Sequence, residues 1–146
     1  MKNLPLVAVL DSNEYIFALG LFKKPSCELL LDTILENLPS FFIRIPRTIA
    51  EEVRKNLTQE EFKEFMIFVN SATNIDEDTD IPFELGAKYE TLGLKSADAL
   101  IAAYVEWVGA AALVTENRHF LTRQPNLPFK VINAEDCLKF IKSSLR

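Results

Sequence analysis

Three acidic residues lie in stretches of the sequence that otherwise resemble buried segments. Asp98, within SADALIAAY, is the one residue between positions 97 and 104 that is neither apolar nor aromatic. Asp11 directly follows the apolar run LVAVL, and Glu52 lies within TIAEEV. Enclosed carboxylates at close range repel one another, and burying them is costly unless a cation neutralises them. If these acids meet in the fold, they predict a site for a hard divalent ion such as Mg²⁺ or Mn²⁺.

Asp11 and Glu52 also have ordinary explanations, in helix capping and solvation. Asp11 fits an N-cap, and Glu14 three residues later would complete a capping box. Thr48 and Glu51 match a capping box more literally, which leaves Glu52 as an ordinary solvated helix residue. Taken alone, each of these positions is compatible with a purely structural role.

The later polar residues have similar alternatives. With Ser96 as N-cap, Asp98 would occupy the second helical position, where a carboxylate favours the helix dipole by ~0.3–1 kcal/mol. Glu116 and Asn117 follow the run AALVT and fit an ordinary turn. A shared site is favoured only if the fold brings these positions to one place, so the expected elements decide between the two interpretations.

Short apolar runs alternate with segments of helical periodicity along the chain. Four runs predict strands, at 6–10, 41–45, 111–115 and 129–132. Helical segments lie at 14–22, 27–38, 48–57, 60–70, 97–108 and 134–143, and 71–82 is the most loop-like stretch. This alternation predicts an α/β fold of three layers, with helices on both faces of a central parallel sheet. The first strand is the most uniformly apolar and is expected at the centre.

The acids all fall at one edge of this predicted sheet. In open parallel sheets, ligands bind outside the carboxyl ends of the strands. Asp11 lies one residue past the first strand, and Glu116 and Asn117 directly follow the third. Glu52 lies on the helix after the second strand, and Asp98 opens the helix before the third. The elements therefore predict that the scattered carboxylates converge.

Other catalytic chemistries fit the sequence poorly. The chain has a single histidine, His119, which excludes a multi-histidine zinc site and is interpreted as a polar loop residue. No G-x-S-x-G motif accompanies it, and the four scattered glycines form neither a P-loop nor a dinucleotide-binding motif. A phosphatase with an aspartyl nucleophile would show D-x-D after the first strand, whereas this chain has Asp11, Ser12 and Asn13.

Composition sets the broad class of protein. A chain of 146 residues, 49% of them hydrophobic, is expected to form one domain over 1–146 with a substantial core. The net charge of −5 argues against a broad basic face for nucleic acid, although 16 Lys and Arg permit a local basic rim. Cys27 and Cys137 are far apart, which favours free thiols in a reducing compartment. We expect a soluble, cytoplasmic protein with no membrane segment.

Four short motifs, in this order and spacing, resemble the PIN-domain family, the ribonuclease fold of bacterial and archaeal VapC-type toxins. They are LDSN at 10–13, the second glutamate of AEEV at 50–53, SADALI at 96–101 and LVTENRHF at 113–120. The chain departs from the family at Asn117, where many relatives carry Asp, although Glu116 lies beside it. This departure places a second metal site in question.

The resemblance implies roles for specific residues. Asp11, Glu52, Asp98 and Asn117 would be catalytic, and Asp11, Glu52, Asp98 and Glu116 would hold the metal. Ser12, Asn13 and Thr115 would support them, and Arg44, Arg47, Lys95 and Arg118, with His119, would form a basic rim for RNA. For each rim residue, ordinary solubility is the alternative explanation.

The activity implied by the resemblance is Mg²⁺- or Mn²⁺-dependent cleavage of single-stranded RNA by an activated water. The partners implied are a small antitoxin protein and a second copy of the chain, through the apolar segments 27–38 or 62–69, both of which also fit a core. A competing interpretation is a catalytically weakened PIN-like module that binds RNA or protein. A flap-endonuclease-like DNA nuclease would need further helices to grip a duplex, for which 146 residues leave little room.

Overall fold

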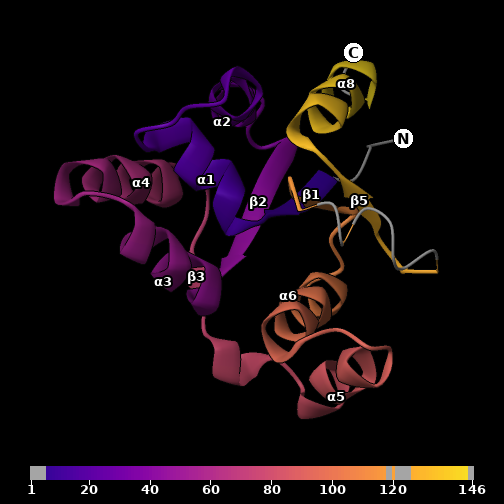
Figure 1. The fold of residues 1–146 in the computed structure, drawn as a ribbon. Coiled ribbons are helices and arrows are strands. Elements are labelled where there is room, and N and C mark those ends of the chain that lie inside the picture. The colour runs from indigo at the N-terminus through magenta and orange to yellow at the C-terminus, as the bar shows by residue number, and fades with distance from the viewer. Residues whose placement is uncertain (1–5, 118–119, 121–125, 145–146) are drawn as a thin grey trace.

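The computed structural model describes residues 6–117, 120 and 126–144, which form an α/β fold around a parallel sheet (Figure 1). The sheet has five described strands in the order β3-β2-β1-β4-β5, and every neighbouring pair is parallel. The strands are β1 (Leu6–Leu10), β2 (Phe41–Pro46), β3 (Ile75–Asp76), β4 (Ala112–Val114) and β5 (Lys130–Ile132). The prediction that the first strand is central is confirmed.

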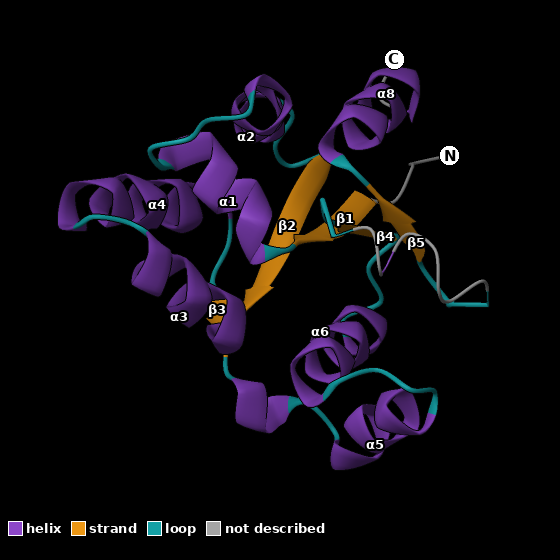
Figure 2. Ribbon diagram, in the orientation of Figure 1, coloured by secondary structure: helices purple, strands orange, loops and turns teal. Residues whose placement is uncertain are grey.

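Helices cover both faces of the sheet, which confirms the predicted three-layer architecture of the PIN-like kind. In Figure 2, α5 and α6 lie on one side of the strands, while α1, α2 and α8 lie on the other. The described α-helices are α1 (Ser12–Leu19), α2 (Pro25–Glu36), α3 (Arg47–Asn56), α4 (Gln59–Ala72), α5 (Phe83–Thr91), α6 (Ser96–Trp107) and α8 (Ala134–Ser144). None of the helices that the structure describes is both long and apolar enough to cross a membrane.

The central strands are buried on both faces, as their apolar sequence predicts. Val9, Leu10 and Leu113 are fully buried between the two helical layers. Tyr15 of α1 is also fully buried, and its ring packs edge-on against Phe65 of α4 with 5.0 Å between the ring centroids. The sheet and the helices packed on it therefore form one support for the residues that follow β1 and β4.

Three elements within the described chain were not expected from sequence. The predicted loop at 71–82 contains β3 and a short 3₁₀ turn (Asp78–Asp80), and α5 follows it. Strand β3 has only two residues, too few for a periodic pattern. Helix α5 has one buried residue, Tyr89, so it has no continuous apolar face that the sequence pattern could show.

The first helix is shifted toward the N-terminus relative to its prediction. It begins at Ser12 and ends at Leu19, before Gly20, so Leu21 and Phe22 are exposed loop residues and not part of a helix. Asp11 is its N-cap, as the capping interpretation held, and its side chain accepts a hydrogen bond from the Ser12 amide. Glu14 completes no capping box, because its side chain turns into the core.

The other two capping hypotheses are wrong in detail. Helix α3 begins at Arg47, its N-cap is Pro46, and it has no side-chain cap, so the proposed Thr48–Glu51 box is not formed. Glu51 instead pairs with Arg54. Helix α6 begins at Ser96 itself, with Lys95 as N-cap, which places Asp98 third in the helix. It still lies in the first turn, where a carboxylate favours the helix dipole.

Candidate metal centre

Three of the predicted acids surround one hollow at the carboxyl edge of the sheet. The hollow has a volume of about 320 Å³. Its lining residues come from the start of α1, from α3 and from the start of α6: Asp11, Ser12, Asn13, Thr48, Ile49, Glu52, Ala97, Asp98 and Ile101. The structure thus brings together Asp11, Glu52 and Asp98, which are far apart in sequence. No lysine or arginine is among the described residues that line it.

Asp11 is the buried member of the group, with 8% of its surface exposed. Its position is fixed by β1 and β4, because its backbone amide continues the sheet by donating to the Val114 carbonyl at 2.9 Å. One carboxylate oxygen, Oδ1, accepts from the Ser12 amide at 2.8 Å, and the other, Oδ2, accepts from the Thr115 hydroxyl at 2.9 Å. Asp11 therefore has a single defined orientation before anything binds.

Burial raises the pKa of the Asp11 carboxyl above its usual value. The hydrogen bonds from Thr115 and Ser12 lower that pKa, whereas the charges of Asp98 and Glu52 raise it further. Asp98 is half-buried and Glu52 is exposed, so water reaches both of these carboxylates. The negative charge in the hollow is thus held at a free-energy cost that a bound cation would remove.

The donor set fits a hard divalent cation. The hollow offers carboxylate oxygens from three residues together with the side-chain oxygens of Ser12 and Asn13, and its described lining residues include neither a sulfur atom nor an imidazole. Mg²⁺ and Mn²⁺ prefer oxygen ligands and keep several bound waters, which suits a hollow that is open to solvent. Such a centre can bind a phosphate oxygen and a water side by side.

Thr115 and Asn117 lie behind Asp11 and do not line the hollow. Thr115 is fully buried. Its hydroxyl accepts a hydrogen bond from the backbone amide of Asn117 at 3.0 Å and donates one to Asp11. The chain after β4 therefore holds Asp11 in place through Thr115. The resemblance to the PIN-domain family implies a supporting role for Thr115, which stays a prediction.

Glu116 lies in a different group of residues. Its carboxylate accepts hydrogen bonds from Lys24 Nζ and, at 3.1 Å, from the backbone amide of Ala134, the first residue of α8. Although partial burial opposes ionisation, hydrogen bonds from Glu14, Lys24 and Ala134 lower the pKa of Glu116. Glu116 therefore does not join Asp11, Glu52 and Asp98 around the hollow.

The group around Glu116 was not found from sequence. Potential ligand atoms of Glu14, Cys27 and Glu116 all lie within 4.8 Å of one another, so these residues could hold a metal ion. The available signal was Glu14 itself, a charged residue among the apolar residues of EYIFAL. The capping interpretation concealed it, because it gave Glu14 a role in a capping box at the helix N-terminus.

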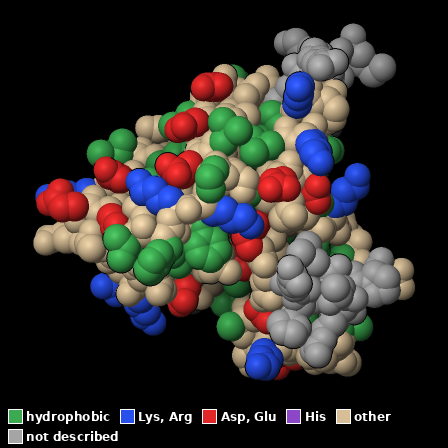
Figure 3. Space-filling model, turned by 45° about the horizontal axis from the view of Figure 1, so that its top comes forward, with side chains coloured by type: hydrophobic (Ala, Val, Ile, Leu, Met, Phe, Trp, Pro, Cys, Tyr) green, Lys and Arg blue, Asp and Glu red, His purple; other side chains and the backbone are tan. Residues whose placement is uncertain are grey.

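The predicted basic rim is partly neutralised by acids. Arg44 Nε donates to Asp76 at 2.9 Å, and Arg47 pairs with Glu77 at 2.7 Å. Lys95 is exposed at the start of α6, whereas Arg118 and His119 lie outside the described residues. On the face drawn in Figure 3, basic and acidic side chains are interspersed and form no single basic field.

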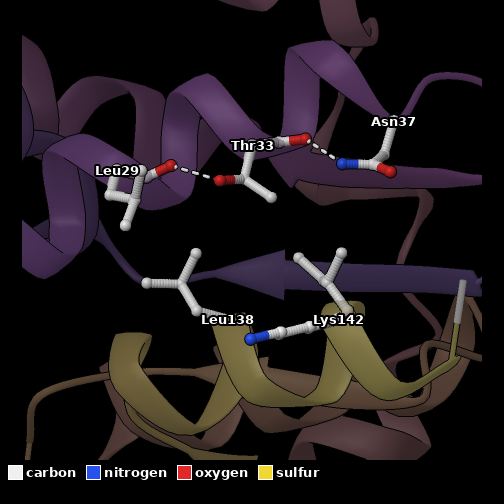
Figure 4. A pocket seen from close by; sticks show the side chains of 6 residues that line it. Leu29, Thr33, Asn37, Leu138 and Lys142 are labelled. Atoms are coloured by element: carbon white, nitrogen blue, oxygen red, sulfur yellow. Dashed lines mark hydrogen bonds between the residues drawn. The ribbon is translucent and has the colours of Figure 1, made fainter. Parts of the chain in front are cut away.

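A second hollow, of about 410 Å³, lies between α2 and α8 (Figure 4). It is lined by Leu29, Thr33, Asn37, Leu138, Ile141 and Lys142. The polar side chains from α2 are bonded within that helix, since Thr33 donates to the Leu29 carbonyl and Asn37 to the Thr33 carbonyl, each at 2.7 Å. The described residues of this lining include no carboxylate, imidazole or thiol, so they supply none of the usual side-chain ligands of a metal centre.

Comparison with known proteins supports the fold. No family model matches the sequence, and no curated protein matches it. Among solved structures, the chain is similar to one in the crystal structure of VapBC2 from Rickettsia felis bound to a DNA fragment from their promoter. The TM-score is 0.60 at 22% sequence identity, over 88% of this chain and 98% of that one. The two chains therefore share their overall fold.

Proposed function

We propose that this protein is a Mg²⁺- or Mn²⁺-dependent endoribonuclease that cleaves phosphodiester bonds of single-stranded RNA. The observation that carries the proposal is the meeting of Asp11, Glu52 and Asp98 around one hollow, and none of the described residues that line it is basic. Neutralising this charge requires a cation from solution, and the donor atoms suit a hard one. The resemblance of the motifs to VapC-type toxins supplies the reaction and the substrate class.

We assign a role in this reaction to each of the following residues. Asp11, Glu52 and Asp98 hold the ion, and Ser12, Asn13 and Thr115 keep Asp11 in its orientation. When bound, such an ion lowers the pKa of a coordinated water and offsets charge on the phosphate. Asn117 remains a candidate catalytic residue through the resemblance, and its backbone amide donates to the Thr115 hydroxyl that fixes Asp11. Glu116 is not retained as a ligand of this ion.

Single-stranded RNA suits the charge distribution better than a duplex. The acidic hollow repels a rigid run of phosphates, whereas a flexible strand can place one phosphate at the ion and splay its bases away. Lys95, Arg44 and Arg47 would contact neighbouring phosphates, the two arginines after leaving their acidic partners. RNA binding would therefore be weak and strongly dependent on salt.

A toxin–antitoxin role accompanies this activity in the proposal. The resemblance to VapC-type toxins and the fold shared with a chain of the VapBC2 crystal structure support it. A small antitoxin protein would cover the acidic hollow, and both would act in the reducing cytoplasm. Self-association would use the residues of α2 and α4 that the core leaves exposed, which are Leu29, Leu35 and Ile67.

A weakened binding module is the competing function. Two observations favour it: Glu52 is exposed, and Asn117 stands where many relatives have an acid. Such a protein would bind RNA or a protein through the same surface without cleaving. It would gain nothing from Asp11, whose burial costs free energy in the absence of a cation.

Cleavage of an end-labelled panel of single-stranded RNAs tests the proposal. Wild type is expected to cleave with Mg²⁺ or Mn²⁺ and to stop when EDTA is added, whereas Asp98→Asn is expected to be inactive under all conditions. Asp32→Asn is the matched control, because Asp32 is an exposed acid on α2 that does not line the hollow. It should cleave like wild type.

Binding of Mn²⁺, followed by calorimetry, separates the two functions if no RNA in the panel is cut. A heat of Mn²⁺ binding that is present in wild type and lost in Asp98→Asn would support the metal centre. The search for a substrate would then turn to other nucleic acids. Equal heats in both proteins, or none, would remove Asp98 from any metal site and favour the binding module.

A further inference from the structure

A second group of convergent donors lies outside the lining of the acidic hollow. It comprises Glu14 on α1, Cys27 on α2 and Glu116 directly after Thr115. Potential ligand atoms of all three lie within 4.8 Å of one another, and none of the three residues lines the Asp11 hollow. The spacing suits one shared ion, since bonds of about 2.0–2.3 Å from a common centre place ligand atoms at such separations.

Glu14 is the unusual member, because its side chain is fully buried yet incompletely bonded. Oε1 accepts a weak hydrogen bond from the Cys27 thiol, with 3.6 Å between oxygen and sulfur. Oε2 is buried and has no partner that can donate to it while both carboxyls are ionised. A buried, unsatisfied carboxylate oxygen costs free energy, so Glu14 calls for a positive partner or a proton.

The neighbouring carboxylate makes this requirement stricter. Carboxylate oxygens of Glu14 and Glu116 lie within 4.8 Å of each other, and the charge of Glu116 adds to burial in opposing the ionisation of Glu14. Two ionised carboxylates have no hydrogen to share, so their contact is favourable only with a proton or a metal cation between them. Lys24 and the Ala134 amide are bonded to Glu116, and Glu14 makes no ion pair with any residue that the structure describes.

We propose that Glu14, Cys27 and Glu116 form a binding site for a thiophilic divalent cation of the Zn²⁺ class. A thiolate and two carboxylates are a donor set that Zn²⁺ accepts, whereas Mg²⁺ and Ca²⁺ prefer oxygen alone. The ion would replace the proton held between the carboxyls and the proton of the thiol. This site is chemically distinct from the acidic hollow and does not rest on the nuclease proposal.

Such an ion would tie three parts of the fold together beside the acidic hollow. It would join α1, α2 and the segment after β4, and Glu116 is the immediate neighbour of Thr115, which holds Asp11. Binding would therefore stabilise the folded protein and fix the chain behind Asp11. No catalytic step is assigned to this ion.

Titration of the reduced protein with Co²⁺ tests the site directly, because a thiolate bound to Co²⁺ gives a near-ultraviolet charge-transfer band. Wild type and Asp98→Asn are expected to show the band with one equivalent of Co²⁺, and Cys27→Ala is expected to lack it. Cys137→Ala is the matched control, since Cys137 is the other buried cysteine and lies near enough to sense the charge of Glu14. It should keep the band.

Zn²⁺-dependent thermal unfolding provides a second readout that needs no cysteine change. Zn²⁺ should raise the Tm of wild type and of Asp98→Asn, and it should leave the Tm of Glu14→Gln unchanged. Absence of the band and of the Tm shift in wild type would overturn the proposal and leave a pair of carboxyls that shares a proton. A band that survives Cys27→Ala, or that disappears in Cys137→Ala, would overturn the assigned ligands.

Discussion

The Thr115 hydroxyl donates a hydrogen bond of 2.9 Å to Asp11 Oδ2, although 104 positions separate the two residues. The contact joins the ends of the neighbouring strands β1 and β4, and both partners are buried. The same hydroxyl accepts a hydrogen bond from the backbone amide of Asn117. One buried oxygen thus sets the orientation of the central carboxylate and the course of the chain after β4.

Replacing Thr115 with Val keeps the shape of the side chain and removes both of these hydrogen bonds. Because the backbone amide of Asn117 and Asp11 Oδ2 each lose the hydrogen bond to the Thr115 hydroxyl, the free energy of unfolding should fall by about 1–3 kcal/mol. Mn²⁺ affinity should fall roughly 10- to 100-fold, since groups that orient metal ligands typically contribute that much. Urea unfolding and calorimetry measure the two effects. Thr115→Ser retains the hydroxyl and should restore most of both, whereas equal Mn²⁺ affinity in the Val variant would show that Asp11 needs no orienting partner.

Asp11 should be a residue whose replacement stabilises the metal-free protein while it abolishes metal binding. Burial and the charges of Asp98 and Glu52 raise the pKa of Asp11, so its ionised form at neutral pH is unfavourable in the fold. Asn is as good an N-cap for α1. In EDTA, Asp11→Asn is therefore expected to raise the free energy of unfolding by roughly 0.5–2 kcal/mol.

Adding Mg²⁺ should reverse that order. Free ion at a hundredfold excess over its Kd would stabilise wild type by about 2.7 kcal/mol and leave Asp11→Asn unchanged. Thermal unfolding of both proteins with and without Mg²⁺ gives the comparison. An equal response of the two proteins to Mg²⁺ would place the ion elsewhere.

The fold and the acidic hollow were largely predictable because they depend on patterns local to the sequence. Asp11 and Asp98 were recognisable from their apolar neighbours, and the rule that ligands bind at carboxyl ends of parallel strands placed them together. Helix α5 and strand β3 were not predictable, because one is mostly exposed and the other has two residues. Their positions are set by contacts with α6 and β2 and not by periodicity.

The direction of Glu116 could not be read from sequence for a different reason. Its carboxylate lies at the N-terminus of α8 and beside Lys24, so its environment depends on how two distant segments dock. The direction of Glu14 depends equally on its surroundings. Glu14 is the third residue of α1, and its side chain turns toward α2 and Cys27 and not back to the N-cap backbone, as a capping box would require. Spacing alone fixes neither how distant segments dock nor which partner a side chain takes.

Lys95 should contribute more to RNA binding than Arg47. Arg47 is already paired with Glu77, whereas Lys95 is exposed and makes no ion pair with any residue that the structure describes. Lys95→Ala is expected to weaken RNA binding and to reduce the slope of log affinity against log salt by about 0.7, the value for one contact to a single strand. Filter binding at several salt concentrations measures this slope.

Glu77→Gln provides the complementary change. It frees Arg47 from its acidic partner, so RNA binding should strengthen and the slope should steepen by a similar amount. If Lys95→Ala and Glu77→Gln both leave the slope unchanged, the RNA passes along another face of the molecule.

Glu14 should make the metal-free protein less stable as the pH rises. Burial, followed by the hydrogen bond and charge of Glu116, raises the pKa of Glu14 to about 9 from a usual value of 4.5. Between these two values the folded state holds a proton that the unfolded chain has lost, so the free energy of unfolding falls with increasing pH across that window. Each unit of pKa difference corresponds to about 1.4 kcal/mol.

Glu14→Gln carries no titrating group, so the stability difference between Glu14→Gln and wild type should grow from pH 5 to pH 8. Urea unfolding in EDTA at both values measures it, with Glu28→Gln on the exposed side of α2 as the control. A constant difference between the two proteins would mean that Glu14 is already ionised at pH 5 and has found a cation within the fold.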